Sequence, residues 1–355
     1  MKYASLISVI ALLGFAACST DSEPTPQPDT DAEAIVFNCG MQPTEEVSTR
    51  AATGLHDVGM NSFRVWAYKN TAVSGNNNYT SYQKVMDGYN VWWETTTTTT
   101  NIHSWEYVNG SSQTVKFWDM SANAYRFAAI APATASHTVS IVGDDTQSLR
   151  LTFPVDATDE ATIPYYSELW YSTGHPIDFS DKQFGSPVKL QFIKPVAYVC
   201  FMFTYEDSND ASTTTLTGKN FKPTDGGLIE QKGDVTVSYP ITGTGTAETF
   251  SVSPDGQDGI TSFTQDFYST PADANSCKIY TVLPAIDQGT YTLQVSVNGE
   301  PKSVVIPAEY MDWLPGHQYT YVFKIRADGG VTIDSVQSAF TPWEIEEGLH
   351  TINNW

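Results

Sequence analysis

The sequence predicts an all-β protein built mostly of antiparallel β-sandwiches. Residues 290–297 alternate cleanly between apolar and polar side chains, and 318–326 repeat this with Tyr319, Tyr321, Phe323 and Ile325 on one face, a period that is typical of half-buried strands. The 24 Gly and 19 Pro fall mostly between such runs, where turns need them. No window has a sustained helical stripe with caps at both ends. Shorter alternating runs lie at 63–69, 115–118, 125–130, 235–239 and 278–283.

The 355 residues leave room for two domains of ordinary size. Residues 189–205 (KLQFIKPVAYVCFMFTY) are apolar on both faces, which predicts a central strand or strand pair broken at Pro195. The preceding residues 174–187 are rich in Gly, Pro, Asp and Ser. We therefore expect a boundary near residue 185, with an N-terminal sandwich over 51–185 and a C-terminal sandwich over 186–355.

The first 17 residues have the organisation of a signal peptide. Lys2 precedes a ten-residue apolar run, 6–15, which is too short to span a bilayer, and two alanines follow it. The Cys18 that comes next resembles the acylated cysteine of a bacterial lipobox, although Phe15 stands where Leu is usual. We expect lipidation at Cys18, with an ordinary secretory signal as the alternative. Residues 19–33 are acidic and rich in Pro, Ser and Thr, which indicates a flexible stalk.

A solitary apolar strand is predicted at 34–41 (AIVFNCGM), with Ile35, Phe37, Cys39 and Met41 on one face. Burying four such side chains contributes very roughly 5–10 kcal/mol before entropy costs, so the strand should belong to the fold. Residues 42–54 read as a loop that contains Arg50-Ala51, a site accessible to a trypsin-like protease. Stalk and strand, 18–50, would then be removable. The alternative for Arg50 is an ordinary linker arginine.

Composition argues against several function classes. The chain carries 40 Asp+Glu against 18 Lys+Arg, a net charge of -22, which disfavours nucleic acid as a partner. The six histidines have no zinc-ligand spacing, and no nucleophile elbow, phosphate loop or HExxH motif occurs. The acidic turns at 255–259 and 328–330 lack the ligand spacing of a calcium loop. We expect no metal, no cofactor and no catalytic residues, hence no enzyme.

Cysteines and aromatic residues remain. With Cys18 lipidated, Cys39, Cys200 and Cys277 are left, and this odd number argues against a disulfide framework. Cys200 and Cys277 lie in apolar runs and are interpreted as small buried hydrophobes, with a bridge between them left open. The aromatic cluster that includes Trp92, Trp93 and Trp105 favours ordinary core packing over stacking on sugar rings.

The order of several motifs resembles the fimbrillin family, the type V pilins of Gram-negative anaerobes. These motifs are the lipobox cysteine, Thr49-Arg50-Ala51, FRVWAY at 63–68, YRFAAIAP at 125–132, IYTVLP at 279–284, LPGHQYTYVFKI at 314–325 and Trp343. The resemblance covers nearly the whole chain. Residues 194–197 (KPVA) depart from the His-Ala of the central segment in relatives, which affects the assignment to a subfamily.

The resemblance implies two tandem transthyretin-like sandwiches, delivered to the outer membrane as a lipoprotein precursor and exposed on the surface or in a fimbrium when mature. An Arg-specific protease would cut between Arg50 and Ala51, and a neighbouring subunit's C-terminal strand would fill the vacated groove. The implied partners are other fimbrial subunits and host or bacterial surface ligands.

In this chain the donor strand would lie within 331–355, and the alternative is that this tail completes its own domain. The rival function is a monomeric surface lipoprotein that binds glycans through its aromatics. The apolar residues of the candidate donor are Val331, Ile333, Val336, Phe340, Trp343 and Ile345.

Overall fold

The computed structural model describes residues 34–41, 54–70, 82–96, 102–108, 113–119, 122, 124–142, 148–168, 187–207, 213–241, 249–256, 259–264, 279–285 and 288–340. Over these residues the chain is almost entirely β-structure, which confirms the predicted all-β class. The described helical segments are two short 3₁₀ turns, η1 (Glu160–Thr162) and η5 (Ala308–Tyr310). No helix in the described ranges is long and apolar enough to cross a membrane.

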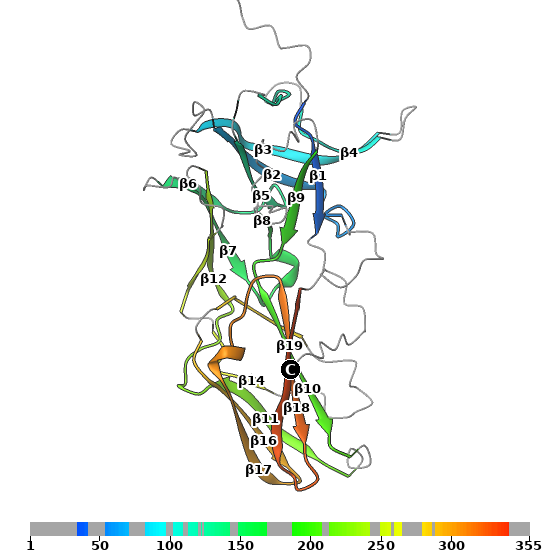
Figure 1. Cartoon of the computed structure of the whole chain (residues 1–355), viewed down its shortest axis with the longest axis vertical. Coiled ribbons are helices and arrows are strands. Elements are labelled where there is room, and N and C mark those ends of the chain that lie inside the picture. Colours follow the sequence, from blue (N-terminus) through cyan, green and yellow to red (C-terminus); the bar gives the residue numbers. More distant parts are fainter. Residues whose placement is uncertain are drawn as a thin grey trace, which may run out of the picture. The chain divides into compact units, whose positions relative to one another are not determined.

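The first sheet is a closed ring of seven strands (Figure 1). It is formed from a strand that precedes the predicted cleavage loop together with six strands that lie between residues 62 and 193. All neighbouring pairs in it are antiparallel except β1–β9, which is parallel. In ring order the strands are β1 (Phe37–Met41), β4 (Ile102–Glu106), β3 (Gln83–Thr96), β2 (Ser62–Asn70), β5 (Ala124–Ala131), β8 (Tyr165–Glu168) and β9 (Val188–Ile193).

Two four-stranded sheets share a second core made of residues from the later part of the chain. One has the order β15 (Ile279–Val282), β10 (Ala197–Tyr205), β18 (His317–Ile325) and β19 (Val331–Phe340). The other has the order β14 (Phe263–Thr264), β11 (Leu216–Pro223), β16 (Tyr291–Val297) and β17 (Glu300–Ile306). This is the sandwich arrangement expected for the C-terminal half, except that β10 and β18 pair in parallel.

The fourth sheet combines strands from both sides of residue 185. Its order is β13 (Thr249–Pro254), β12 (Lys232–Pro240), β7 (Ser148–Asp156) and β6 (Thr138–Val142). Strands β7 and β12 pair over nine residues, and their inward side chains share a core with Trp66 of β2 and Ile130 of β5. Because β7 and β12 pair across residue 185, this sheet belongs to neither predicted domain alone. The predicted domain boundary near residue 185 therefore stays a prediction.

Local sequence accounts for the turns that matter here. Pro195 separates β9 from β10, as expected for a residue that cannot donate to a ladder. Asn298 and Gly299 both have positive φ, 51° and 86°, in the two-residue turn between β16 and β17. Such a turn matches the twist of a hairpin and favours Asn-Gly. One predicted strand is missing, because 115–118 forms only an isolated bridge between Phe117 and Ala34.

Candidate functional site

The candidate site is the position that β1 occupies between β9 and β4. β1 pairs with β9 in parallel over five residues, from Phe37 opposite Val188 to Met41 opposite Phe192. On its other side it makes a single pair with β4, Phe37 opposite Trp105. Figure 1 shows β1 running beside β9. The closed sheet is thus sealed by a strand that has one long ladder and one short one.

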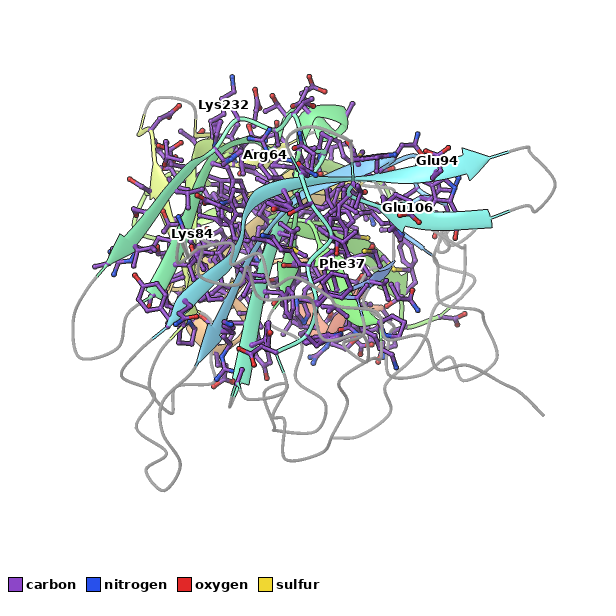
Figure 2. The ribbon with its side chains drawn as sticks, turned by 90° about the horizontal axis from the view of Figure 1, so that it is seen from above. Phe37, Arg64, Lys84, Glu94, Glu106 and Lys232 are labelled. Atoms are coloured by element: carbon purple, nitrogen blue, oxygen red, sulfur yellow. The ribbon has the colours of Figure 1, made fainter. Side chains whose placement is uncertain are left out.

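The inward face of β1 forms part of the core of the closed sheet. Ile35, Phe37 and Cys39 are at most 6% exposed, whereas Val36 is 41% exposed. The Phe37 ring lies 5.7 Å from Phe63, with the two ring planes nearly perpendicular, and it also contacts the rings of Tyr107 and Phe127. Figure 2 shows Phe37 within the crowded interior of the molecule. Of the β1 side chains that are buried in this core, Phe37 is the largest.

The C-terminal part of β1 lies beside the segment that follows the predicted cleavage loop. The Leu55 N–H donates to the Cys39 carbonyl at 3.3 Å, and the Leu55 side chain is fully buried. Cys39 itself is a free thiol, and burial raises its pKa well above the ordinary value. A shielded, protonated thiol is unreactive. Cys39 therefore behaves as a structural residue for as long as β1 is in place.

The N-terminal end of β1 is held by hydrogen bonds to residues that follow β4. The Ile35 N–H donates to the Lys116 carbonyl at 2.8 Å. The Tyr107 hydroxyl donates to the Ile35 carbonyl at 2.8 Å and accepts from the Lys116 N–H at 3.1 Å. Tyr107 is buried, and this burial raises the pKa of its hydroxyl, so the hydroxyl keeps its proton for donation. Both backbone polar groups of Ile35 are thus bonded before the ladder to β9 begins.

The tryptophans proposed for glycan stacking mostly pack against, or hydrogen-bond with, other side chains of the protein. Trp105 is 7% exposed and packs against Phe63, so it does not present a face to solvent. Trp93 packs on Trp105 and stacks on His56 at 4.7 Å. Trp92 is half-buried, and its indole N–H donates to Glu94 at 3.2 Å. This arrangement favours the core interpretation of the aromatic cluster.

The candidate donor residues lie in β19, which pairs with β18 of its own domain from Val331 to Phe340. Val331, Ile333 and Val336 are partly buried and pack on the second core. Residues 331–340 therefore agree with the alternative interpretation, in which the tail completes its own domain. Trp343 and Ile345 fall outside the described residues, as do Cys18, Arg50, Ala51 and Cys277.

Sequence reasoning missed two features. The first is the Tyr107–Ile35 bond, since nothing in the local pattern marks Tyr107 as a partner of a residue 72 positions away. The second is that Cys200 is disulfide-bonded, which corrects the favoured interpretation of it as a small buried hydrophobe, although a bridge for it had been left open. The odd number of cysteines concealed this, because Cys39 is the one that stays free. No group of side chains suited to a metal ion occurs within the described ranges.

A closed ring of seven strands together with three four-stranded sheets defines an all-β protein. Comparison with known families places the chain more closely. The Fimbrillin-like family matches residues 49–343, and the chain belongs to this family. The family is of a structural, fimbrial type, so the chain is a fimbrial-type protein of the cell surface.

Several solved structures match this chain over most of their length. A candidate cell adhesion protein from Bacteroides uniformis is 15% identical, with a TM-score of 0.41 over 86% of this chain and 98% of that one. One from Bacteroides ovatus is 15% identical, with a TM-score of 0.40 over 89% and 98%. The fimbrial anchor protein Mfa2 from Porphyromonas gingivalis is 10% identical, with a TM-score of 0.31 over 86% and 97%. A search of curated proteins found no match.

Proposed function

We propose that the protein is a fimbrial subunit that is exported as an outer-membrane lipoprotein and assembles by strand exchange. In this proposal Cys18 carries the lipid, cleavage between Arg50 and Ala51 releases stalk and β1, and a strand of another subunit takes the place of β1. The assembled fimbria serves adhesion to host or bacterial surfaces. Membership of the Fimbrillin-like family supports the association with other fimbrial subunits.

The observation that carries the proposal is the position of β1. It is a short strand that, together with Ile35 just before it, supplies three buried side chains to the core, and it is joined to the rest of the chain through residues 42–53, which contain Arg50. Losing those side chains would expose a row of apolar surface and the unpaired edge of β9. Unpaired strand edges readily accept an added strand, with alternate side chains in pockets. A replacement strand would restore both the ladder and the core.

The donor region of the proposal is narrower than 331–355. Val331, Ile333, Val336 and Phe340 belong to β19, whose backbone is already paired to β18. Donating these residues to another subunit would break the ladder between β18 and β19. We therefore place the donor within 341–355, where Trp343 and Ile345 supply alternating apolar side chains.

N-terminal sequencing of protein isolated from the cell surface tests this function. The expected start is Ala51, and an Arg50→Ala variant should keep the blocked Cys18 and fail to enter fibres. Arg50→Lys is the matched variant, since it keeps the charge and separates an Arg-specific protease from one that accepts either residue. A blocked Cys18 on all of the mature wild-type protein would overturn strand exchange for a shaft subunit.

A further inference from the structure

Exposed apolar side chains gather at the N-terminal end of β1. Nine large hydrophobic residues of the described part of the chain are well exposed, and four of them belong to this region. These four are Val36, Val108, Val115 and Phe117, each 41–43% exposed. Single exposed hydrophobic residues are ordinary on a protein surface, whereas a contiguous group of them marks a contact with another molecule.

Strand geometry places three of these side chains next to one another. Ala34 forms an antiparallel bridge with Phe117, so Val36, two residues further along the chain, lies opposite Val115. Residues that stand opposite each other in an antiparallel pair point to the same face. The intervening Lys116 points to the other face, where its ammonium lies 5.6 Å from the centre of an aromatic ring. Val36, Val115 and Phe117 therefore form one outward surface, which we call the apolar patch.

Most of the apolar patch is held in place without β1. The Gln113 side chain accepts from the Asn90 N–H and donates to the Asn90 carbonyl, both at 2.8 Å, and it also donates to the Tyr107 carbonyl. The Tyr107 hydroxyl accepts from the Lys116 N–H at 3.1 Å. A buried amide with its partners satisfied holds its neighbours rigidly. The patch residues at 115 and 117 thus keep their support when β1 and its Val36 are released.

The proposed donor strand brings its own subunit to this end of β1. β1 is parallel to β9, and the evenly spaced bonds of a parallel ladder re-form only with a strand of the same direction. Such a donor has its N-terminal end beside the apolar patch. In the donor subunit β19 ends at Phe340, and Trp343 of the proposed donor follows three residues later. Three residues span at most about 10 Å, so the sandwich that carries the donor reaches the patch.

That sandwich has an exposed apolar residue at the end from which the donor extends. Phe340 pairs with His317, the first residue of β18. Directly before it the chain turns, and the His317 N–H donates to the Leu314 carbonyl at 3.4 Å. The Leu314 N–H donates to the Tyr319 hydroxyl at 2.9 Å, which holds the turn in place. Leu314 is 40% exposed and therefore offers an apolar contact close to the start of the donor.

We propose that Val115 and Phe117 form a docking surface for the C-terminal sandwich of a second copy of this chain. Leu314 of that copy packs on them once its donor strand occupies the place of β1. The contact removes apolar surface of both copies from water and adds to the stability that the strand itself provides. It also favours entry of the donor in the direction of β1. This inference rests on the proposed function, which supplies the donor.

Crosslinking of chains cleaved after Arg50 tests the docking surface. One copy carries Phe117→Cys and the other Leu314→Cys, both with Cys39→Ala, and a short bismaleimide joins thiols that lie close together after assembly. We expect a crosslinked dimer. Asp57→Cys in place of Phe117→Cys is the matched control, since Asp57 is exposed in the turn beside the C-terminal end of β1. A crosslink from position 57 and none from position 117 would overturn the proposal, because the donor subunit would then lie at the opposite end.

Assembly of a patch variant gives an independent measurement. The double variant Val115→Ser, Phe117→Ser should weaken the association of cleaved copies about tenfold, because it removes apolar area that the contact buries. Val305→Ser is the matched control, since Val305 is 58% exposed on β17, and it should leave association unchanged. Urea unfolding of the uncleaved variants checks that they fold. The crosslinking measurement keeps the proposal falsifiable if the double variant does not.

The outcomes distinguish this surface from the proposed function. If cleaved wild-type chains neither assemble nor bind a peptide of residues 341–355, strand exchange fails and the docking surface fails with it. If the double variant assembles as well as wild type and no crosslink forms between positions 117 and 314, strand exchange stands and the docking surface is overturned. If the double variant loses only the binding of lipidated precursor to phosphatidylcholine vesicles, the patch is a membrane contact and the proposal is wrong.

Discussion

Replacing Phe37 by Ala tests whether β1 seals the core of the closed sheet. Phe37 is 6% exposed and its ring contacts those of Phe63, Tyr107 and Phe127. Truncating a buried Phe costs about 3–5 kcal/mol, from lost transfer free energy and the cavity left behind. That is a large part of the roughly 5–15 kcal/mol by which a domain is stable. We therefore expect at least about a hundredfold shift in the unfolding equilibrium of this sheet.

Urea unfolding followed by tryptophan fluorescence measures the effect, since Trp105 and Trp118 lie in the same core as Phe37. The control is Val36→Ala on the same strand, where the side chain is 41% exposed and the cost should stay within about 0.5 kcal/mol. If Phe37→Ala and Val36→Ala both lay within 1 kcal/mol of wild type, β1 would contribute little to this core. The reasoning behind the proposed strand exchange would then fail with it.

Three further predictions follow from single residues. The Cys39 thiol should resist maleimide labelling in the intact chain and react quickly after cleavage and release of β1, as mass spectrometry would show; equal rates would contradict its burial. Burial lowers the pKa of Lys194 to about 8, so the unfolded chain binds more protons between pH 8 and 10.5 and stability should rise with pH in that window. Lys194→Met should lose this rise in thermal unfolding, and its persistence would refute the assignment. Gly299→Ala should cost about 1–2 kcal/mol because φ is 86° there, whereas Gly289→Ala should be nearly neutral in the same unfolding assay.

Local pattern was sufficient for several of the strands and for their inward faces. The alternation at 34–41 predicts that Ile35, Phe37 and Cys39 share a face, and all three are buried. The two-faced apolar run at 189–205 predicts a central strand or strand pair broken at Pro195, and the structure has a pair there, with β9 before Pro195 and β10 after it. Both results depend on side-chain periodicity within a single element, which a single sequence records directly.

The sequence did not indicate which strands pair with each other. Nothing near β1 indicates that it pairs in parallel with β9, about 150 residues away, or that β7 pairs with β12. The failure at 115–118 has the same origin, because an alternating segment becomes a strand only where a neighbour pairs with it along its length. The exposure of Trp105 was equally undetermined, since an indole fits a core and a surface platform alike.

The unequal ladders of β1 are consistent with the strand exchange that we propose. Five residues pair with β9 but only Phe37 pairs with β4, so removing β1 breaks one full ladder rather than two. What holds β1 is therefore mainly the burial of Ile35, Phe37 and Cys39 and the Tyr107 bond at its N-terminal end. These interactions need alternating apolar side chains and a backbone carbonyl, and they need no particular residue. Under the proposed strand exchange, a site built in this way would hold its own strand until cleavage and would then accept a strand with the same apolar pattern.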